Sequence, residues 1–309
     1  MKVGFIGLGA MGRGIAANIR KADYPLVVHD LNAESADAVI KAGAVWASSP
    51  AEVAKSADVV FTSLPMPADV EAVAYGDKGL LSGLRKGAAW IDVSTNSLEV
   101  VKRLDAATTE RGGHFMDAPL GGVPTNAAAG TLTIWVGGEQ AQYEKHKPLL
   151  EAISDRTVYM GSAGAATITK LAQNMASCAI NSVILEILTM GVKAGVELLP
   201  LWEGLRSGKL GQSRPFDNIA PRLLPGKFDP PSFQLRLVQK DINLALQLGR
   251  ESNVPMRICN IVAQDIAEAM NRGWATRDAQ SFLSIQPERA GLPPFEVPMD
   301  QIQAVLDRS

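Results

Sequence analysis

Three glycines between an apolar strand and a helix constrain the fold of this chain more than any other feature. Lys2–Ile6 has the composition of a short buried strand, and Gly7, Gly9 and Gly12 follow it before a helical pattern of apolar residues. The first glycine permits a tight turn, the second lets a pyrophosphate approach the backbone, and the third lets helix and strand pack closely. The pattern predicts a dinucleotide-binding unit with phosphates at a helix N-terminus. Its cofactor-binding residues are predicted to be Gly7, Leu8, Gly9, Ala10, Met11 and Gly12.

An acidic residue at the end of the second predicted strand supports this interpretation. Glycine turns are common, and the motif alone also fits an ordinary connection between strand and helix. Here, however, Leu26–His29 forms a second strand that leads into Asp30, about twenty residues beyond the glycines, where a carboxylate meets the ribose hydroxyls of the adenosine. A carboxylate repels a 2′-phosphate, and Leu31 and Asn32 provide no arginine to hold one. We therefore expect NAD rather than NADP as the cofactor.

Strand and helix patterns alternate up to about residue 163. Strands are predicted at 58–61, 88–92, 114–116, 131–136 and 157–160, with a glycine-containing loop at 117–124 and a helix at 139–153. Ligands of open α/β sheets bind beyond the carboxyl ends of the strands. The residues expected to line that crevice are Leu64, Pro65, Ser94 and Thr95. Ser94 and Thr95 fit equally well as the N-cap of the helix that follows at Leu98.

From Thr167 onward, apolar residues recur every three or four positions and no alternating strand pattern returns. The helix that begins there is apolar on nearly all sides, as expected for a helix inside a bundle or an interface. Further helices are predicted around residues 199–205, 215–224, 233–249, 255–271 and 278–285, with a last one after Pro298. The sequence predicts a Rossmann α/β domain over 1–163 and an all-α domain for substrate binding and oligomerisation over 164–309, linked by the long helix. We expect a homodimer or homotetramer.

The stretch 161–174, which leads into this long helix, contains one lysine and one asparagine. Lys170 and Asn174 are four residues apart, so they project from the same helical face. Taken alone, the stretch favours a structural interpretation, in which Lys170 reaches solvent and Asn174 forms a hydrogen bond to another helix. With a dinucleotide signature upstream, a catalytic amine beside an orienting amide becomes the favoured interpretation.

Composition and charge argue against several functional classes. The net charge is -2 with a pI near 6.0, and the basic residues are scattered, so we expect no nucleic-acid partner. The apolar region 180–196 is interrupted by polar residues that would be costly in lipid, so we expect no membrane span. Met1-Lys2 leads directly into a strand without a signal-peptide pattern, which predicts a cytoplasmic protein.

Neither the cysteines nor the histidines form a chemical site. Cys178 and Cys259 lie in apolar helical patterns without the spacing of metal ligands or disulfides, which favours core packing in a reducing compartment. The chain's three histidines, at positions 29, 114 and 146, do not belong to one motif. We therefore expect no metal site and no Ser-His-Asp arrangement.

With these motifs in hand, the sequence resembles the β-hydroxyacid dehydrogenase family, which includes 3-hydroxyisobutyrate dehydrogenase and tartronate semialdehyde reductase. The resemblance spans nearly the whole chain. Four ordered motifs carry it, namely residues 5–12, 117–119, 161–174 and 233–245. It implies an NAD-dependent oxidoreductase that transfers a hydride between NAD(H) and a small 3-hydroxy acid or the corresponding semialdehyde acid.

The resemblance also implies roles for individual residues. Lys170 corresponds to the catalytic lysine, a general acid/base, and Asn174 to a substrate-binding partner. The loop after Pro119 corresponds to the binder of the substrate carboxylate, so Gly121 and Gly122, with Ser94 in the crevice, are candidate substrate contacts. The cofactor contacts that it implies are Leu64, Pro65, Thr95 and Lys240. Lys240 also fits a solvated ion pair with its neighbour Asp241.

The substrate loop departs from the family pattern. Family members commonly read Asp-Ala-Pro-Val-Ser-Gly-Gly, whereas this chain continues after Pro119 with Leu120, Gly121, Gly122 and Val123. Gly121 lacks the serine hydroxyl, and Val123 adds a branched side chain where the family has glycine. The family pattern therefore does not identify the substrate of this chain. A sulfolactaldehyde-reductase branch carries arginine at the position of Gly122, which argues against a sulfonate.

Two alternatives to the dehydrogenase remain. One is a non-catalytic nucleotide-binding interaction module, which the presence of Lys170 and Asn174 disfavours. The other is an imine reductase with the same architecture, a branch that normally lacks a lysine at this position.

Overall fold

Short, apolar strands build the first part of the chain into one sheet. The computed structural model describes residues 1–208, 214–253 and 255–307. It divides into two units, Met1–Leu171 and Ala172–Ser309. The domain boundary after residue 163 stays a prediction. Within residues 1–171, all of which are described, the strands are β1 (Val3–Ile6), β2 (Leu26–His29), β3 (Val45–Trp46), β4 (Val59–Thr62), β5 (Ala89–Asp92), β6 (His114–Asp117), β7 (Leu120–Gly121), β8 (Leu132–Gly138) and β9 (Ser154–Gly161).

The order of the strands creates a switch point beside β1. The order is β3-β2-β1-β4-β5-β6-β8-β7, with β9 paired to β8. All pairs from β3 to β6 are parallel, β8 is antiparallel to β6 and β7, and β9 is parallel to β8. The chain builds outward from β1 in one direction and then from β4 in the other. Such a reversal is where open α/β sheets bind their ligands.

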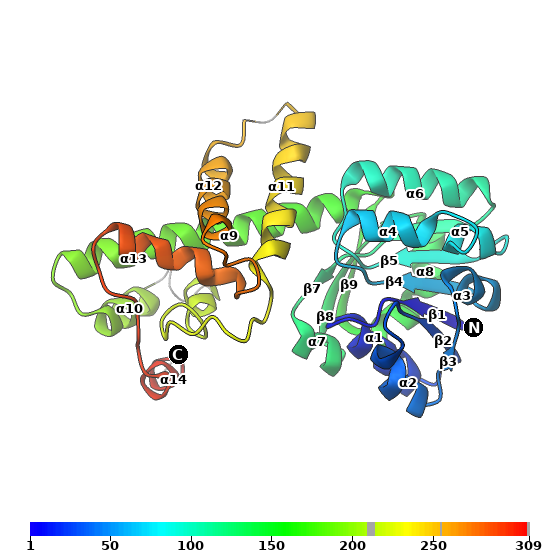
Figure 1. The fold of residues 1–309 in the computed structure, drawn as a ribbon, viewed down its shortest axis with the longest axis horizontal. Helices are drawn as coiled ribbons and strands as arrows, with labels where there is room; N and C mark the ends of the chain where they lie inside the picture. Colours follow the sequence, from blue (N-terminus) through cyan, green and yellow to red (C-terminus); the bar gives the residue numbers. More distant parts are fainter. Residues whose placement is uncertain (209–213, 254, 308–309) are drawn as a thin grey trace. The chain divides into compact units, whose positions relative to one another are not determined.

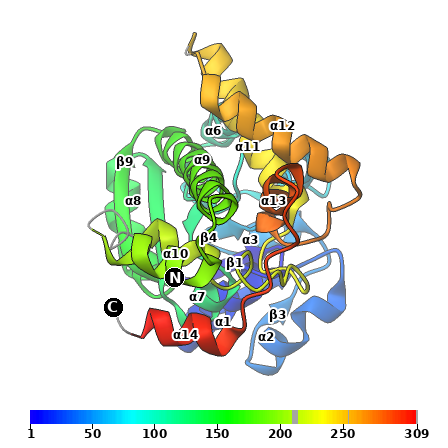
Figure 2. The same ribbon diagram turned by 90° about the vertical axis from the view of Figure 1, so that its left-hand side faces the viewer.

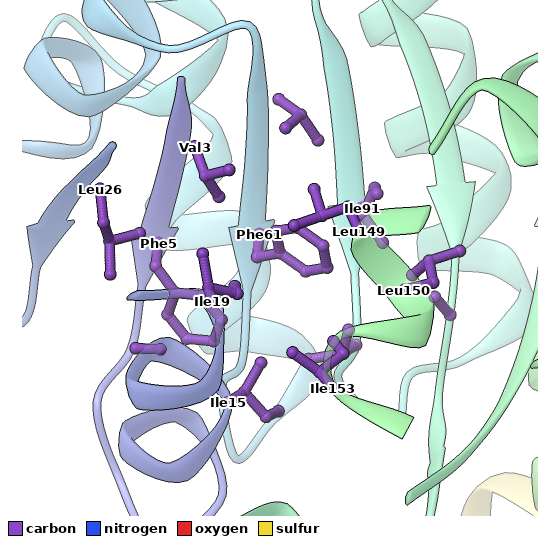
Figure 3. Packing of buried hydrophobic residues seen from close by; sticks show 14 of the residues in the cluster. Val3, Phe5, Ile15, Ile19, Leu26, Phe61, Ile91, Leu149, Leu150 and Ile153 are labelled. Atoms are coloured by element: carbon purple, nitrogen blue, oxygen red, sulfur yellow. The ribbon is translucent and has the colours of Figure 1, made fainter. Parts of the chain in front are cut away.

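Helices cover both faces of this sheet, as Figure 1 shows. They are α1 (Gly12–Lys21), η1 (Ala33–Ala36), α2 (Asp37–Lys41), α3 (Pro50–Ser56), α4 (Pro67–Ala74), α5 (Leu80–Gly83), α6 (Leu98–Glu110), α7 (Pro124–Ala129) and α8 (Gln140–Glu151). Successive strand residues point to opposite faces, so each strand supplies two cores. On one face, Phe5 and Phe61 stack at 5.9 Å beneath α1 and α8 (Figure 3). On the other, Trp90 meets Phe115 edge to face at 5.2 Å, beside α3 to α6.

The described residues of the second unit form helices that are joined by turns and loops. Its elements are most of α9 (Ala165–Lys193), followed by α10 (Leu198–Ser207), η2 (Arg214–Ile219), α11 (Leu235–Glu251), α12 (Arg257–Asn271), η3 (Ala279–Ser284), α13 (Ile285–Arg289) and α14 (Met299–Leu306). Figure 2 shows α11 and α12 side by side. Buried Arg206 of α10 contacts Asp217 at 2.6 Å and donates to the carbonyl of Val305, which holds the last helix in place.

The predicted fold class, a Rossmann domain followed by an all-α domain, is confirmed. Two short strands were beyond sequence patterning, because two residues show no periodicity: β3 was not predicted, and β7 lies inside the stretch predicted as a loop. The helix predicted around 215–224 is shorter than expected, because the 3-10 helix η2 ends at Ile219 and Pro221 has no N–H for a helical bond. Among the described residues, no helix is both long and apolar enough to cross a membrane.

Candidate active site

The carboxyl ends of five parallel strands form one edge of the sheet. Because β1, β2, β4, β5 and β6 run in the same direction, the residues that follow them share this edge. These residues are Gly7, Asp30, Leu64, Ser94 and Ala118. Most of the candidate residues of the first unit therefore lie at the carboxyl ends of the strands, along the same edge of the sheet.

The glycine loop after β1 has the geometry that its sequence predicts. Gly7 has a φ of +94°, and a Cβ there would lie 2.3 Å from the carbonyl oxygen of Ser63. A Cβ on Gly12 would lie 1.9 Å from the carbonyl oxygen of Gly7. Gly9 differs, because nothing lies within 4 Å of an added Cβ. The outer glycines are thus required by packing, whereas the middle one borders open space, at the position where this motif brings a pyrophosphate to the backbone.

Asp30 holds the glycine loop as well as standing where a ribose is expected. Its Oδ2 accepts a 2.6 Å hydrogen bond from the N–H of Leu8, and its Oδ1 accepts one of 2.8 Å from the N–H of Asn32. Sequence reasoning missed this bond to the loop. The neighbouring Leu31 is 100% exposed, so its side chain packs against no other part of the protein. The arrangement fits the adenosine half of a dinucleotide.

Ser94 connects the ends of β4 and β5. Its buried hydroxyl accepts a 2.9 Å hydrogen bond from the N–H of Leu64. The cap of α6 is Ser97, whose Oγ accepts from the N–H of Val100 at 3.1 Å. The alternative that Ser94 and Thr95 cap this helix is therefore wrong. The serine stabilises the crevice loop instead.

A buried carboxylate that the sequence did not single out organises the same loop. Asp92 at the end of β5 accepts hydrogen bonds from the Thr62 hydroxyl (2.8 Å), the N–H of Ser94 (3.2 Å) and the Asn96 amide (3.2 Å). The Trp90 indole donates to the Thr62 hydroxyl at 2.9 Å. Burial raises the pKa of Asp92, while these donors act in the opposite direction. Asp92 fixes the backbone that leads to Ser94 and Thr95.

Asp117 ties the first turn of α9 to the end of β6. Its Oδ1 accepts a 2.8 Å hydrogen bond from the N–H of Gly164, and its Oδ2 accepts one of 2.7 Å from the N–H of Thr167. Gly137 is needed beside it, since a Cβ there would lie 2.4 Å from Asp117 Oδ1. Burial raises the pKa of Asp117, opposed chiefly by the two backbone donors. Two N–H groups at a helix start are thus satisfied by one carboxylate.

Lys170 follows Thr167 by three residues on α9, so Asp117 fixes the start of the helix that carries it. Lys170 is half-buried. One turn further along, the Asn174 amide donates a 2.7 Å hydrogen bond to Asp241 Oδ2 on α11. The structural interpretation of Asn174, a hydrogen bond to another helix, is therefore confirmed. Its role in substrate binding stays a prediction.

The second unit holds its candidate lysine in a buried ion pair. Lys240 Nζ lies 3.0 Å from Asp241 Oδ1, with the two side chains 10% and 2% exposed. The prediction of a solvated pair is wrong, because α11 buries its face that bears Asp241. Oδ1 interacts by charge, since it accepts no hydrogen bond of normal geometry. A cofactor contact by Lys240 stays a prediction.

The predicted substrate loop begins with the strand β7. Gly121 pairs with Thr133 of β8, and Gly122 has a φ of +131°, a conformation that L side chains rarely adopt. Val123 is 42% exposed and precedes α7. Within the described residues, no group of three or more His, Cys, Asp or Glu side chains could hold a metal ion.

Comparison with known proteins matches both halves of the chain. Residues 2–161 match the family described as "NAD binding domain of 6-phosphogluconate dehydrogenase", and residues 164–285 match "NAD-binding of NADP-dependent 3-hydroxyisobutyrate dehydrogenase". The chain is 30% identical over 292 residues to 2-(hydroxymethyl)glutarate dehydrogenase of Eubacterium barkeri, covering 94% of this chain and 97% of the relative. It is 32% identical over 285 residues to mitochondrial 3-hydroxyisobutyrate dehydrogenase of Mus musculus, covering 90% and 85%.

Solved structures show the same architecture. The Mycobacterium tuberculosis 3-hydroxyisobutyrate dehydrogenase with L-serine matches with a TM-score of 0.83 at 26% identity, covering 91% of this chain and 97% of that one. An imine reductase from a Pseudomonas species matches with a TM-score of 0.59 at 20% identity, covering 94% and 99%. The second likeness concerns the fold alone.

Proposed function

This chain belongs to the β-hydroxyacid dehydrogenase family, and we propose that it transfers a hydride between NAD(H) and a short 3-hydroxy acid. The semialdehyde acid is the other partner of the pair. The observation that carries the proposal is the pair of hydrogen bonds that the Asp117 carboxylate accepts from the N–H groups of Gly164 and Thr167. They hold the first turn of the helix that bears Lys170 at the sheet edge that also carries the glycine loop.

The glycine loop and Asp30 would hold the cofactor. NAD or NADP, when bound, accepts or delivers the hydride. The open space above Gly9 and the N-terminus of α1 suit a pyrophosphate, and the Asp30 carboxylate suits the ribose hydroxyls. NAD is preferred because Asp30 would repel a 2′-phosphate while Leu31 supplies no cation. Leu64, Pro65 and Thr95 would complete the contacts from the neighbouring strand ends, and Lys240 would add one from α11.

Lys170 moves the proton. In the oxidative direction its Nζ receives the proton of the substrate hydroxyl, and in the reductive direction the same group returns it to the carbonyl oxygen. Asn174 orients the substrate from the next turn of α9, and the Asp241 carboxylate fixes the rotamer of its amide. The loop at Gly121 and Gly122, together with Ser94, would receive the substrate carboxylate, although the loop itself has no hydroxyl.

A screen of substrates and cofactors tests this function. Short 3-hydroxy acids with NAD and with NADP, and the matching semialdehydes with NADH and NADPH, are offered to the purified protein. We expect turnover of at least one acid, with a higher kcat/KM for NAD than for NADP. Reduction of cyclic imines without turnover of any acid would establish the imine reductase instead. NADH binding without turnover of any compound would establish the non-catalytic module.

Assembly and location extend the proposal. The described surface of α9 exposes Ile180 by 43% and Val183 by 52%, and α12 exposes Ile258 by 63% and Ile261 by 59%. Apolar side chains of this size favour contact with another copy, so we propose a homodimer or homotetramer. Light scattering that gave the mass of one chain would contradict it. A cytoplasmic location stays a prediction.

A further inference from the structure

A tryptophan lies where a side chain at residue 121 would stand. Leu120 and Gly121 of β7 pair with Ile134 and Thr133 of β8. Leu120 and Ile134 point into the core beneath α1 and α8. Because strand residues alternate between faces, Gly121, Thr133 and Trp135 share the opposite face.

The contact between Gly121 and the indole is close. A Cβ on Gly121 would lie 2.8 Å from Trp135 Cη2, 3.2 Å from Trp135 Cζ3 and 3.4 Å from Thr133 Cβ. The backbone of Gly121 has no positive φ, unlike that of Gly122 at +131°. Glycine at 121 is therefore required by the ring and not by the backbone conformation.

The edge of the ring that meets Gly121 is hydrocarbon. Cη2 and Cζ3 belong to the six-membered ring, away from Nε1, so no indole N–H points at this contact. Trp135 is half-buried, and Val123, two residues beyond Gly121, is 42% exposed. Where a serine would offer a hydroxyl, this chain thus offers two apolar side chains. Of the two side chains that share the face with Gly121, only that of Thr133 carries a hydroxyl.

We propose that Trp135 forms an apolar wall of the substrate pocket and selects 3-hydroxy acids that carry a hydrocarbon group on C2 over acids that carry a hydroxyl there. The inference rests on the proposed function, because it takes the loop after Pro119 as the place of the substrate carboxylate. A hydroxyl pressed against the ring loses its water without gaining a partner, whereas a methyl group of nearly the same volume gains contact. Discrimination of roughly 10- to 200-fold is typical of an apolar pocket.

Two acids of nearly equal shape provide the test. We would measure kcat/KM for 3-hydroxy-2-methylpropanoate and for 2,3-dihydroxypropanoate, with saturating NAD, in wild type, Trp135→Ala, Gly121→Ser and the double variant. The wild type is expected to prefer the methyl compound by about tenfold or more. Trp135→Ala should reduce that ratio, and the double variant, with both room and a hydroxyl, should reduce it further or reverse it.

Gly121→Ser alone should lower the melting temperature, because its Cβ meets the ring, and Trp135→Ala in the same chain should restore part of the loss. If Trp135→Ala does not fold, Trp135→Met carries the test with a smaller shift in the ratio. Trp274→Ala, which changes a half-buried tryptophan of the second unit, is the control and should leave the ratio unchanged.

The outcomes separate the inference from the function. An active wild type whose ratio stays within about twofold in every Trp135 variant overturns the role of Trp135 and leaves the dehydrogenase standing. A wild type that turns over no hydroxy acid with either cofactor overturns the proposed function, and the inference with it.

Discussion

The loops after β1 and β6 lie on the same edge of the sheet and are built in opposite ways. In the first, Gly7 and Gly12 are held by contacts with backbone carbonyls, so almost no other residue fits. In the second, Gly121 is held by the side chain of Trp135. Backbone contacts stay the same when neighbouring side chains change, whereas the contact at Gly121 depends on one ring. The first loop is therefore constrained by the backbone itself, whereas the second, the proposed substrate loop, depends on a side chain that can change.

The largest effect is expected from the first loop. Gly12→Ala brings a Cβ within 1.9 Å of the Gly7 carbonyl oxygen and should cost about 3 kcal/mol or more of unfolding free energy. Gly9→Ala is the matched variant, because nothing lies within 4 Å of its new Cβ. It should keep its stability but weaken NADH binding by about tenfold or more, since the methyl enters the space expected for the pyrophosphate. Thermal unfolding measures the stability of the two variants, and NADH titration measures their affinity for the cofactor. Equal stability of Gly12→Ala and Gly9→Ala would contradict the different roles of the two glycines.

The anchor of the second loop gives the next effect. Asp117→Asn replaces one of two acceptors by a donor that faces the N–H of Gly164 or Thr167, at a cost of about 1–3 kcal/mol. We expect kcat to fall because the start of the Lys170 helix is no longer fixed, with NADH affinity nearly unchanged. Asp155→Asn, at an exposed aspartate of β9, is the control. A normal kcat in Asp117→Asn would contradict the positioning role.

The effect of Asp117→Asn on stability should also depend on pH. Burial raises the pKa of Asp117, so the stability that its acid form contributes is complete below the ordinary carboxyl pKa of about 4 and is lost as the pH rises through the higher folded value. The amide that Asp117→Asn introduces cannot titrate. The stability difference between wild type and Asp117→Asn should therefore narrow from about pH 4 towards neutrality. Chemical unfolding at several pH values checks this, and a difference that grows with pH would show that the hydrogen bonds outweigh burial.

A smaller effect is expected at the adenosine end of the first loop. Leu31 is 100% exposed, so Leu31→Arg adds a cation beside Asp30 without disturbing packing. NADP should gain several-fold in affinity relative to NAD because the guanidinium can pair with a 2′-phosphate. Leu31→Gln tests whether length alone suffices. An equal gain in NADP affinity in Leu31→Arg and Leu31→Gln would show that the charge is not the cause.

The smallest effect belongs to the exposed side chain of the second loop. Val123→Ala removes two methyl groups from a residue that is 42% exposed, so stability should change by about 0.5 kcal/mol or less. NADH affinity should not change, while the KM for the hydroxy acid should shift by a few-fold if Val123 borders the pocket. A change in NADH affinity instead would contradict the separate roles of the two loops.

The sequence predicted the parts of the site that depend on backbone geometry. The glycine spacing and Asp30 define a βαβ unit through local chain conformation. The tight turn predicted at Gly7 and the close packing predicted at Gly12 are both present in the structure. The bond from Asp30 to the N–H of Leu8 joins residues 22 positions apart in the chain, which no local pattern reveals. Periodicity likewise gave the long strands and helices but not the two-residue strands β3 and β7.

The buried carboxylates were beyond sequence patterning for a different reason. Asp92 and Asp117 end apolar strands, a place where acidic residues usually meet solvent or ligand, and nothing local shows that both accept several internal hydrogen bonds. The contact of Gly121 with Trp135 depends on the register of β7 against β8. In the sequence, Gly121 looks like an ordinary loop glycine. Only the pairing of β7 with β8 shows that the Trp135 ring occupies the space where a side chain at residue 121 would lie.

The most direct test of the central claim is the kcat of Lys170→Ala on the best hydroxy acid, measured beside the NADH dissociation constant of the same preparation. We expect kcat to fall about 100- to 10,000-fold, because the hydroxyl proton has no acceptor, with NADH affinity nearly unchanged. A Lys170→Ala enzyme within a few-fold of the wild-type kcat would contradict it.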